Sequence, residues 1–468
     1  MIHRPVAADG WRAAVGEALA EGWRFAGLHA TREDATPALL TVLTRGSDAL
    51  VLRCRAPERR VASLVDLVPA AAWDEREAHD LHGWSLPGHD PLRPLVDHDV
   101  PADAWTAPLV GRDAYRVAVG PIHAGVIESG HFRFAVVGER VLHIDVRLFH
   151  KHRGLEAAAE GHRHTEAIRY AQRACAADAV TNAVAYAQAC EAATGLVAVP
   201  AVARARTLLL ELERLYNHVN DISAICAGVG FAAGTMLFAA LKERAQRLNA
   251  ALTGHRFLFD AVQVGGSRLE LDAQAVGEAR AELDALRAEV ARGRRELAFA
   301  GSLQERMAGI GRVSAGEVVT LGGVGPSARA AGVAIDARTA SPQLAYDGFA
   351  PAAPTVPTGD VAARFELRGI ELGATFELLD RLLDAPLAPA ACVGGAAGDG
   401  LGVAVVESPR GQSLCVVELD GDRVGRLHLR TGSYANWPLV ALAGRDALLP
   451  DFPLVNKSFE LCYACVDR

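Results

Sequence analysis

Apolar and polar positions change their spacing along the chain, and this change predicts two regions of different structure. In the first hundred residues, short apolar runs of strand length occupy 49–54 and 61–68. A polar, Pro-rich stretch follows at 87–108 and is typical of a linker. We therefore predict a small N-terminal α/β domain, with its linker, over residues 1–105 and a second domain over residues 106–468.

The second domain is expected to be mainly helical, with β-structure near both of its ends. Residues 132–137 and 141–148 flank a Gly138-Glu139 turn, which is typical of a hairpin, and strands are expected again within 403–429. The segment 309–357 is rich in Gly, Pro, Ser and Ala and is expected to be irregular. Apolar positions at helical spacing predict helices at 164–194, 202–225, 237–252, 273–298 and 371–383. The fold class expected for the whole chain is α+β.

One uncharged window, residues 222–241, is as long as a membrane span, which needs about 20 residues. Three glycines interrupt it, at positions 228, 230 and 234, and Asp221 and Lys242 bound it closely. A buried helix, a short gap and a second helix explain this pattern better than a transmembrane segment. The first residues lack the basic start and the apolar core of a signal peptide, so we expect a cytoplasmic chain.

Composition narrows the possible functions. Half of the 468 residues are hydrophobic and 22% are charged, which is typical of a folded globular protein. The formal net charge is −8, so the chain offers no basis for nucleic-acid binding. Eight cysteines are too few for a disulfide scaffold and fit a reducing compartment. No Walker-type loop occurs, and no Gly-x-Gly-x-x-Gly follows a predicted strand, so no nucleotide site is expected.

The sharpest chemical feature is the pair Cys462-x-x-Cys465, because two thiols in one tight turn can chelate a soft or borderline metal ion. Zinc sites normally combine two such pairs, and a partial counterpart here is Cys175-x-x-Asp178, in a stretch predicted to be helical. Residues three apart share a helix face, so this pair could meet the C-terminal thiols. Taken alone, the spacing favours the simpler interpretation, in which Cys175 is a small buried residue and Asp178 a surface residue.

Six further segments match one family pattern, in the same order along the chain. They are residues 120–134, 149–156, 211–218, 252–257, 407–411 and 451–459. With this set, the chain resembles the large subunit of group-4, energy-converting nickel–iron hydrogenases, which is related to the quinone-site subunit of respiratory complex I. The block around residues 73–77 and 88–89 resembles the small partner subunit of complex I, which is fused to the front of formate hydrogenlyase-type large subunits.

The resemblance implies roles for individual residues. In these hydrogenases two Cys-x-x-Cys pairs hold nickel, and two of the four thiolates bridge to iron. Cys175 matches the first cysteine of the first pair, and Cys462 and Cys465 match the second pair, which implies a nickel–iron site. Glu128 matches the glutamate that relays protons near the metal, and Arg410 matches the arginine that overhangs the metal pocket.

The relation to complex I implies a second kind of site. His123 could line a quinone-type cavity, and His152 is a second candidate for binding such a cofactor. Simpler roles are open for both residues. His123 could cap a strand, and the segment from His152 to Glu156 could be a turn held by an Arg–Glu pair.

Departures from the family pattern affect the metal site most. Asp178 stands where the first pair has its second cysteine, and a hard carboxylate there would weaken nickel binding and remove one bridging sulfur. Asn182 stands where the family usually has His, and Glu460-Leu461 precede Cys462 where active hydrogenases usually have Asp-Pro. No removable tail is expected after Cys465.

The expected partners follow from what this chain lacks. No cysteine spacing here could hold an iron–sulfur cluster, so electrons must come from clusters in a partner, most simply an iron–sulfur small subunit. The resemblance also implies integral-membrane, ion-translocating subunits, with quinone as a further candidate ligand. These partners would place the chain on the inner face of the cell membrane as a cytoplasmic, peripheral subunit.

Three hypotheses for the function remain open at this point. The first is a hydrogenase-like oxidoreductase subunit with a degenerate nickel–iron-type site of three cysteines and Asp178. The second is a metal-free subunit that interacts with quinone or another acceptor in a complex I-like assembly. The third is a non-catalytic structural subunit that holds zinc or only supports its partners.

Overall fold

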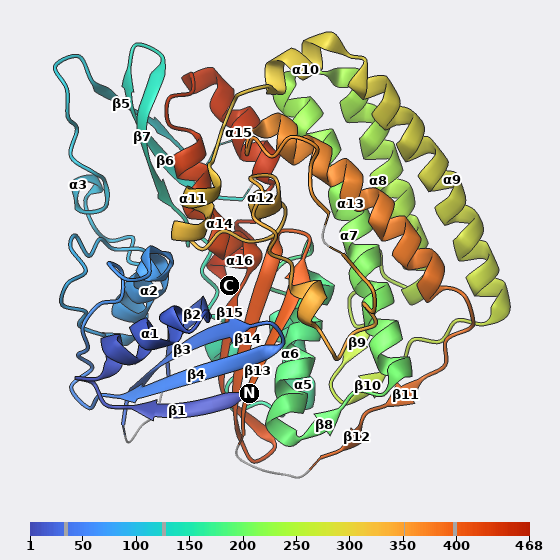
Figure 1. Cartoon of the computed structure of the whole chain (residues 1–468), viewed down its shortest axis with the longest axis horizontal. Coiled ribbons are helices and arrows are strands. Elements are labelled where there is room, and N and C mark those ends of the chain that lie inside the picture. Colours follow the sequence, from blue (N-terminus) through green and yellow to red (C-terminus); the bar gives the residue numbers. More distant parts are fainter. Residues whose placement is uncertain (32–35, 124–127, 351, 396–399) are drawn as a thin grey trace.

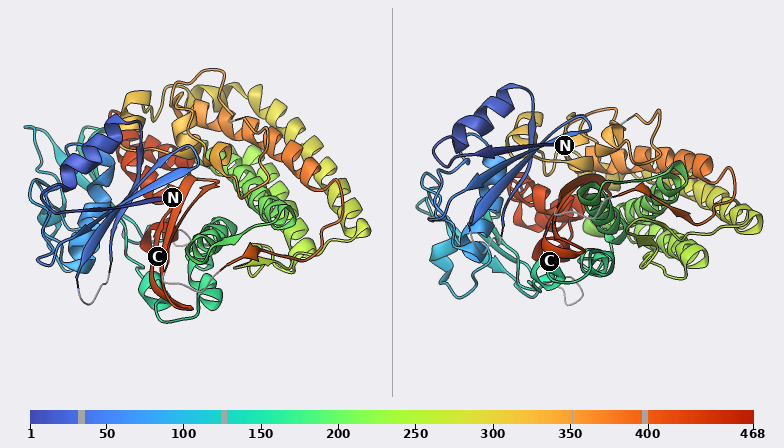
Figure 2. Two further views of the ribbon diagram at one scale, coloured as in Figure 1. Left: turned by 60° about the horizontal axis from the view of Figure 1, so that its bottom comes forward. Right: turned by 90° about the horizontal axis from the view of Figure 1, so that it is seen from below.

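The computed structural model describes residues 1–31, 36–123, 128–350, 352–395 and 400–468. A small N-terminal sheet lies beside a three-stranded sheet in the middle of the molecule, and long helices form the opposite side (Figure 1). Two further views show the same arrangement, with the N-terminal sheet crossing the outer face of the central strands (Figure 2). The chain is therefore of the α+β class, as predicted.

The N-terminal sheet is covered on both faces. Its strands lie in the order β1-β4-β3-β2, and β1 and β4 are parallel. One face packs on the two helices of the N-terminal domain, and the other packs on Leu414 and Val416 of the central sheet. The strands can therefore be apolar on both sides. These elements are β1 (Ile2–Val6), α1 (Trp11–Ala20), β2 (Arg24–Ala30), β3 (Ala38–Arg45), β4 (Asp48–Arg55) and α2 (Ala72–His82).

The strand predicted at 61–68 does not form, and this prediction was wrong. The carboxylate of Glu75 accepts hydrogen bonds from Ser63 Oγ at 2.7 Å and from Leu64 N at 2.5 Å. The backbone N–H of Ser63 donates to Pro87 O at 2.9 Å. These groups are held by a side chain and a loop, so the segment buries apolar side chains without joining a sheet.

The central antiparallel sheet consists of β13 (Leu401–Ser408), β14 (Gly411–Asp420) and β15 (Arg423–Arg430). Its second face packs on α6 (Ala179–Thr194), whose sequence is rich in alanine. Small side chains on both elements allow a close approach. A Cβ at position 402 would lie 1.8 Å from the Ala189 carbonyl oxygen of α6.

We expect Gly402→Ala to destabilise the protein by about 2–3 kcal/mol, because the added methyl group forces β13 away from α6. Urea unfolding at equilibrium would measure the change. Gly277→Ala is the matched control, since that position has open space and lies inside a helix, where alanine is favoured by about 1 kcal/mol. Equal stability of the two variants would contradict the prediction.

The long helices are α7 (Pro200–Val229), α8 (Ala232–Thr253), α9 (Ala273–Ala298) and α13 (Val361–Leu382). Helix α7 packs on α8 and α13, and α9 packs on α8 (Figure 1). The predicted gap within 222–241 is confirmed, since α7 ends at Val229 and Gly230 adopts a left-handed conformation before α8 begins. Within the described ranges, none of the helices combines the length and apolarity needed to cross a bilayer.

The remaining elements surround this frame. The predicted hairpin forms, and the segment expected to be irregular contains only short helices. The remaining helices and strands are α3 (Ala102–Trp105), β5 (Tyr115–Val119), β6 (His131–Val137), β7 (Arg140–Arg147), α4 (Leu155–Ala159), α5 (His164–Gln172), β8 (Leu196–Val197), β9 (Val262–Gln263), β10 (Gly266–Ser267), α10 (Gly301–Met307), α11 (Ala315–Thr320), α12 (Gly325–Arg329), β11 (Ala390–Ala391), β12 (Val393–Gly394), α14 (Gly432–Ala443), α15 (Phe452–Phe459) and α16 (Ala464–Asp467).

Candidate metal centre

Two tight turns carry the candidate ligands. The predicted single helix over 164–194 is wrong, because α5 ends at Gln172 and α6 begins at Ala179. Cys175 and Asp178 therefore lie in a turn and not on a helix face. The N–H of Asp178 donates to Cys175 Sγ at 3.2 Å. The C-terminal turn repeats this geometry, since the N–H of Cys465 donates to Cys462 Sγ at 3.4 Å.

The two turns meet in the interior of the molecule. Cys465 Sγ lies 2.8 Å from Cys175 Sγ and 3.1 Å from Asp178 Oδ2. The sulfur atoms of Cys175, Cys462 and Cys465 all lie within 4.8 Å of one another. Metal–sulfur and metal–oxygen bonds of about 2.0–2.3 Å bring the ligands of one ion to such separations. The three sulfurs therefore fit a shared metal ion, and the Asp178 carboxylate lies beside one of them, Cys465 Sγ.

Charge is distributed unevenly among the three thiols. Hydrogen bonds from the Cys175 and Cys465 thiols lower the pKa of Cys462 well below its ordinary value. The pKa of Cys175 is raised, first by its hydrogen bond to Cys462, and that of Cys465 is raised mainly by burial. Burial raises the pKa of Asp178 to about 6 against the opposing charge of Arg410. A metal ion held by these groups would favour their deprotonated forms, so its binding would release protons.

Glu128 lies against the C-terminal turn. Its Oε2 accepts a hydrogen bond of 2.6 Å from Ala464 N, between the two cysteines of the pair. Burial raises the pKa of Glu128, and the charge of Cys462 adds to the rise. The structure therefore places this carboxyl group next to the thiols, as a half-buried group that keeps a proton to higher pH than an exposed glutamate.

A loop at 149–154 joins the two turns. The guanidinium of Arg153 donates to Ala174 O at 2.7 Å, directly before Cys175. His152 Nδ1 lies 2.6 Å from Asp467 O, two residues after the second turn. His152 is exposed and holds the end of the chain through this contact.

His123 lies beside the C-terminal turn. Its ring contacts the rings of Phe132 and Tyr463, with centroids 5.7 and 6.2 Å apart. Burial lowers the pKa of His123, which favours the neutral form of its ring. The residues that follow His123, at 124–127, lie outside the described part of the chain.

Arg410 enters the site from the turn between β13 and β14. Its Nη1 donates to Asp221 Oδ2 at 2.6 Å, and its Nη2 donates to Asn217 Oδ1 at 3.1 Å. Two backbone carbonyls of this turn region, those of Glu407 and Ser408, accept hydrogen bonds from Arg214. Helix α7 therefore fixes both the turn and the guanidinium that it carries.

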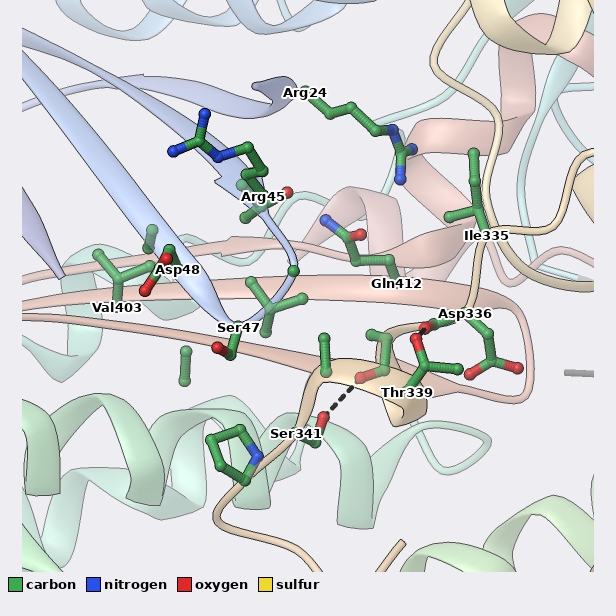
Figure 3. A pocket seen from close by; sticks show the side chains of 18 of the residues that line it. Arg24, Arg45, Ser47, Asp48, Ile335, Asp336, Thr339, Ser341, Val403 and Gln412 are labelled. Atoms are coloured by element: carbon green, nitrogen blue, oxygen red, sulfur yellow. Dashed lines mark hydrogen bonds between the residues drawn. The ribbon is translucent and has the colours of Figure 1, made fainter. Parts of the chain in front are cut away.

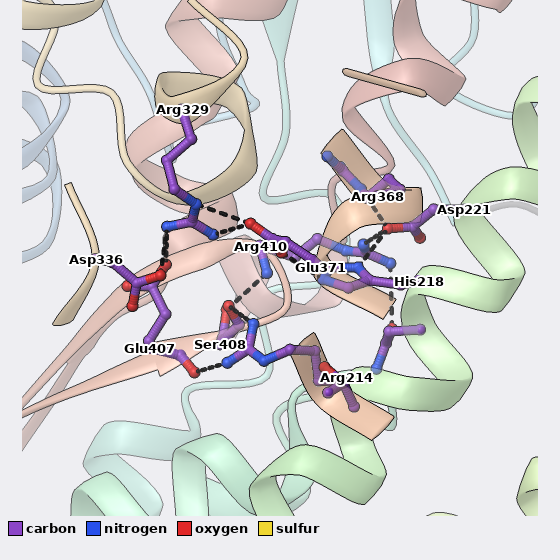
Figure 4. A network of polar contacts seen from close by, with 12 residues as sticks. Arg214, His218, Asp221, Arg329, Asp336, Arg368, Glu371, Glu407, Ser408 and Arg410 are labelled. Atoms are coloured by element: carbon purple, nitrogen blue, oxygen red, sulfur yellow. Dashed lines mark hydrogen bonds and ion pairs between the residues drawn. The ribbon is translucent and has the colours of Figure 1, made fainter. Parts of the chain in front are cut away.

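Arg410 is one end of a buried network of charges (Figure 4). Asp221 also accepts from Arg368 Nε at 2.7 Å, and His218 Nδ1 lies 3.3 Å away. Burial opposes ionisation of Asp221, but Arg410 and Arg368 outweigh it and hold its pKa below the ordinary value. His218 Nε2 continues the chain to Glu371 Oε2 at 2.7 Å. Asp221 is thus kept as the anion that aligns Arg410.

Helix α7 also supports the first turn. The carboxylate of Glu213 accepts from Val180 N at 2.6 Å and from Thr181 N at 3.1 Å, at the start of α6. This contact fixes Asp178, which directly precedes α6. Glu213, Arg214 and His218, all on α7, thus make structural polar contacts.

Two residues beside the site were not found from the sequence. Asp221 aligns Arg410, and Asp467 accepts hydrogen bonds from Phe149 N at 2.7 Å and Lys151 N at 2.8 Å. The sequence did indicate that Asp221 contacts His218, because the two residues are three apart on one predicted helix. For Asp467 the indication was weaker, namely its position two residues after the thiol pair.

A separate cavity of about 310 Å³ opens between the β3–β4 turn, the segment 334–343 and strands β13 and β14. Polar groups line much of it, among them Arg24, Ser47, Thr339, Ser341 and Gln412 (Figure 3). Its wall includes Asp336, which pairs with Arg329 of the buried network at 3.0 Å. None of the four candidate metal ligands lines this cavity.

The fold and the comparisons define an oxidoreductase subunit. Residues 228–390 match the family model of the 49 Kd subunit of respiratory-chain NADH dehydrogenase, and residues 24–111 match that of its 30 Kd subunit. The chain is 30% identical over 436 residues to formate hydrogenlyase subunit 5 of Escherichia coli K12. The match covers 87% of this chain and 76% of that protein. This chain therefore belongs to the family of large subunits of hydrogenases and complex I-like oxidoreductases.

Two other similarities agree with this assignment. Hydrogenase-4 component G of Escherichia coli K12 is 28% identical over 441 residues, or 88% of this chain and 77% of that protein. A solved chain of the membrane-bound sulfane sulfur reductase, an archaeal respiratory membrane complex, superposes with a TM-score of 0.70. That chain is 26% identical, and the match covers 76% of this chain and 99% of that one. The relatives are thus subunits of hydrogenases and of a respiratory membrane complex.

Proposed function

We propose that this chain is the subunit that performs H2 and proton chemistry in a membrane-associated, energy-converting hydrogenase. The observation that carries the proposal is the convergence of the sulfur atoms of Cys175, Cys462 and Cys465, with the Asp178 carboxylate 3.1 Å from Cys465 Sγ. Apolar residues could fill this space equally well. Packing therefore does not explain why thiols and a carboxylate from distant segments gather here. Their arrangement suits a metal site instead.

Nickel and iron are the metals that we propose for this site. Soft thiolates suit both, and when bound they supply an open coordination position at which H2 can be split or formed. Asp178 stands where the family has a fourth sulfur ligand, so this position would hold the metals through a carboxylate oxygen. A carboxylate binds these metals less strongly than a thiolate, and we expect a weaker site than one with four cysteines.

The proposed roles of the chain's other residues follow from their contacts. Glu128 would accept and return the proton, because it lies against the thiol turn and burial raises its pKa. Arg410 would orient anionic ligands of the metals, since Asp221 and Asn217 fix its plane. Its buried Nε has no hydrogen-bond partner among the described residues and remains available as a donor.

His123 and His152 both contact the C-terminal turn or the residues directly after it. We propose that His123 borders the entry to the site, since its ring contacts Tyr463 between the two cysteines of the C-terminal pair. We propose that His152 stabilises the same turn from the outside through Asp467 O. Neither contact is specific for quinone.

We further propose the partners and the location that this function requires. An iron–sulfur small subunit would deliver electrons, and ion-translocating membrane subunits would use the released energy, with the chain peripheral on the inner face of the membrane. The division at residue 105 is proposed as a boundary between two domains, and the match of residues 24–111 to the 30 Kd family model supports it.

The proposal predicts that Cys465→Ser lowers nickel and iron in the purified complex about a hundredfold. Serine keeps the size of the side chain but replaces the soft sulfur by a poor ligand. Elemental analysis of the complex, corrected for iron–sulfur clusters, measures the effect. Cys415→Ser is the control, because Cys415 is equally buried but lies in β14 facing α6.

Two results would contradict the proposal in different ways. Zinc alone in the wild-type complex would support the structural alternative. Absence of metal together with intact reduction of a quinone acceptor would support the metal-free alternative.

A further inference from the structure

Arg468 is a buried cation three residues after Cys465. Its side chain is 2% exposed, and its guanidinium reaches three acceptors from separate elements. Nη2 donates to Glu77 Oε2 of α2 at 2.5 Å, and Nη1 donates to Glu156 Oε1 of α4 at 2.8 Å. Nη1 also donates to the carbonyl of Leu429 in β15. We call these contacts the Arg468 clamp.

Only a short helical segment separates the Arg468 clamp from the thiol turn. Helix α16 is a single turn, and Arg468 N donates to Ala464 O at 3.1 Å. Ala464 N in turn donates to Glu128. The carboxylate of Asp467 is held by two backbone N–H groups of the 149–154 loop. A displacement of Arg468 would therefore move the turn that carries the thiols.

One clamp residue comes from the N-terminal part of the chain. Glu77 lies on α2, which contacts β15 through a second ion pair, Asp74 with Arg430 at 2.8 Å. The two acids are one helical turn apart on α2 and are similarly buried. Among the contacts of these two acids within the described residues, only that of Glu77 reaches the segment directly after the thiol turn.

We propose that Glu77 is a positioning residue for the metal site, and that it sets the geometry of Cys462 and Cys465 through Arg468. This inference rests on the proposed function. It implies that the affinity of the metal site for its metal depends on helix α2 in the N-terminal part of the chain. A buried cation needs its charged partners, so Glu77 and Glu156 together fix the guanidinium at one position.

Titration of the purified full-length chain with Co²⁺ alone tests the proposal. The probe reports affinity, and its thiolate-to-cobalt absorption band reports the ligand geometry. We expect Glu77→Gln to raise the dissociation constant about ten- to a hundredfold and to shift the band. We expect Asp74→Asn, which breaks the neighbouring ion pair on the same helix, to change the constant less than threefold.

Hydrogen exchange of the segment 462–468, read by mass spectrometry without metal, gives an independent result. Glu77→Gln should speed exchange in this segment, and Asp74→Asn should not. Arg468→Lys, which keeps the charge but loses the planar fork, should act like Glu77→Gln. The proposal is overturned if Glu77→Gln behaves as wild type, or if Asp74→Asn has an equal effect. Failure of the wild-type chain to bind Co²⁺ through thiolates would count against the metal site, while the exchange data would still decide the role of Glu77.

Discussion

Glu128→Gln is expected to lower H2–proton exchange by the complex by a factor of about 10²–10⁴ while leaving assembly intact. Glutamine has the shape of glutamate and keeps an oxygen that can accept the hydrogen bond from Ala464 N. It cannot take up or release a proton near neutral pH. The change therefore separates proton transfer from the support of the turn.

The raised pKa of Glu128 gives this prediction its direction. Burial and the nearby charge of Cys462 disfavour the ionised carboxylate, so the group holds its proton to higher pH. A proton carrier works best when its pKa is close to the operating pH. Glu139→Gln is the control, because Glu139 is an exposed acid on the turn between β6 and β7. Exchange at the wild-type rate in Glu128→Gln would remove Glu128 from the proton path.

The sequence could predict the fold class and the elements with regular apolar spacing. Helix α9 was predicted at its observed bounds, 273–298, because its buried positions recur every three or four residues on a solvated helix. Helix α13 was predicted ten residues too short at its start. Its first half places Arg364 and Arg368 in the interior, and buried arginines look like surface residues in a sequence.

The candidate site could be predicted from motifs but not from spacing. Cys175 lies in a turn, yet residues 173–178 contain neither Gly nor Pro, so no local signal marks the end of α5. The turn depends instead on distant contacts, such as Glu213 at the start of α6 and Arg153 at Ala174 O. Only the resemblance of the flanking motifs brought Cys175 together with the C-terminal pair before the structure was known.

The buried charge network could not be predicted from the sequence either. Breaking it at Arg329 is expected to cause a large loss of stability. Arg329 is 1% exposed and pairs with Glu371 at 2.6 Å, Glu407 at 2.8 Å and Asp336 at 3.0 Å. We expect Arg329→Met to destabilise the protein by about 3–5 kcal/mol at pH 7, because it leaves three buried carboxylates with too few cations. Urea unfolding at several pH values would measure the loss.

The pH dependence distinguishes this cause from a simple packing defect. In the variant, the unpaired carboxylates have pKa values raised above those of the unfolded chain, which are about 4. A raised carboxylate pKa costs stability above the unfolded pKa, and the cost disappears when both states are protonated. The loss should therefore be largest at neutral pH and shrink as the pH falls toward 4. Arg292→Met, which removes an arginine 58% exposed on α9, should change stability by less than about 0.5 kcal/mol. A loss in Arg329→Met that is independent of pH would show that packing, and not charge, gives this residue its effect.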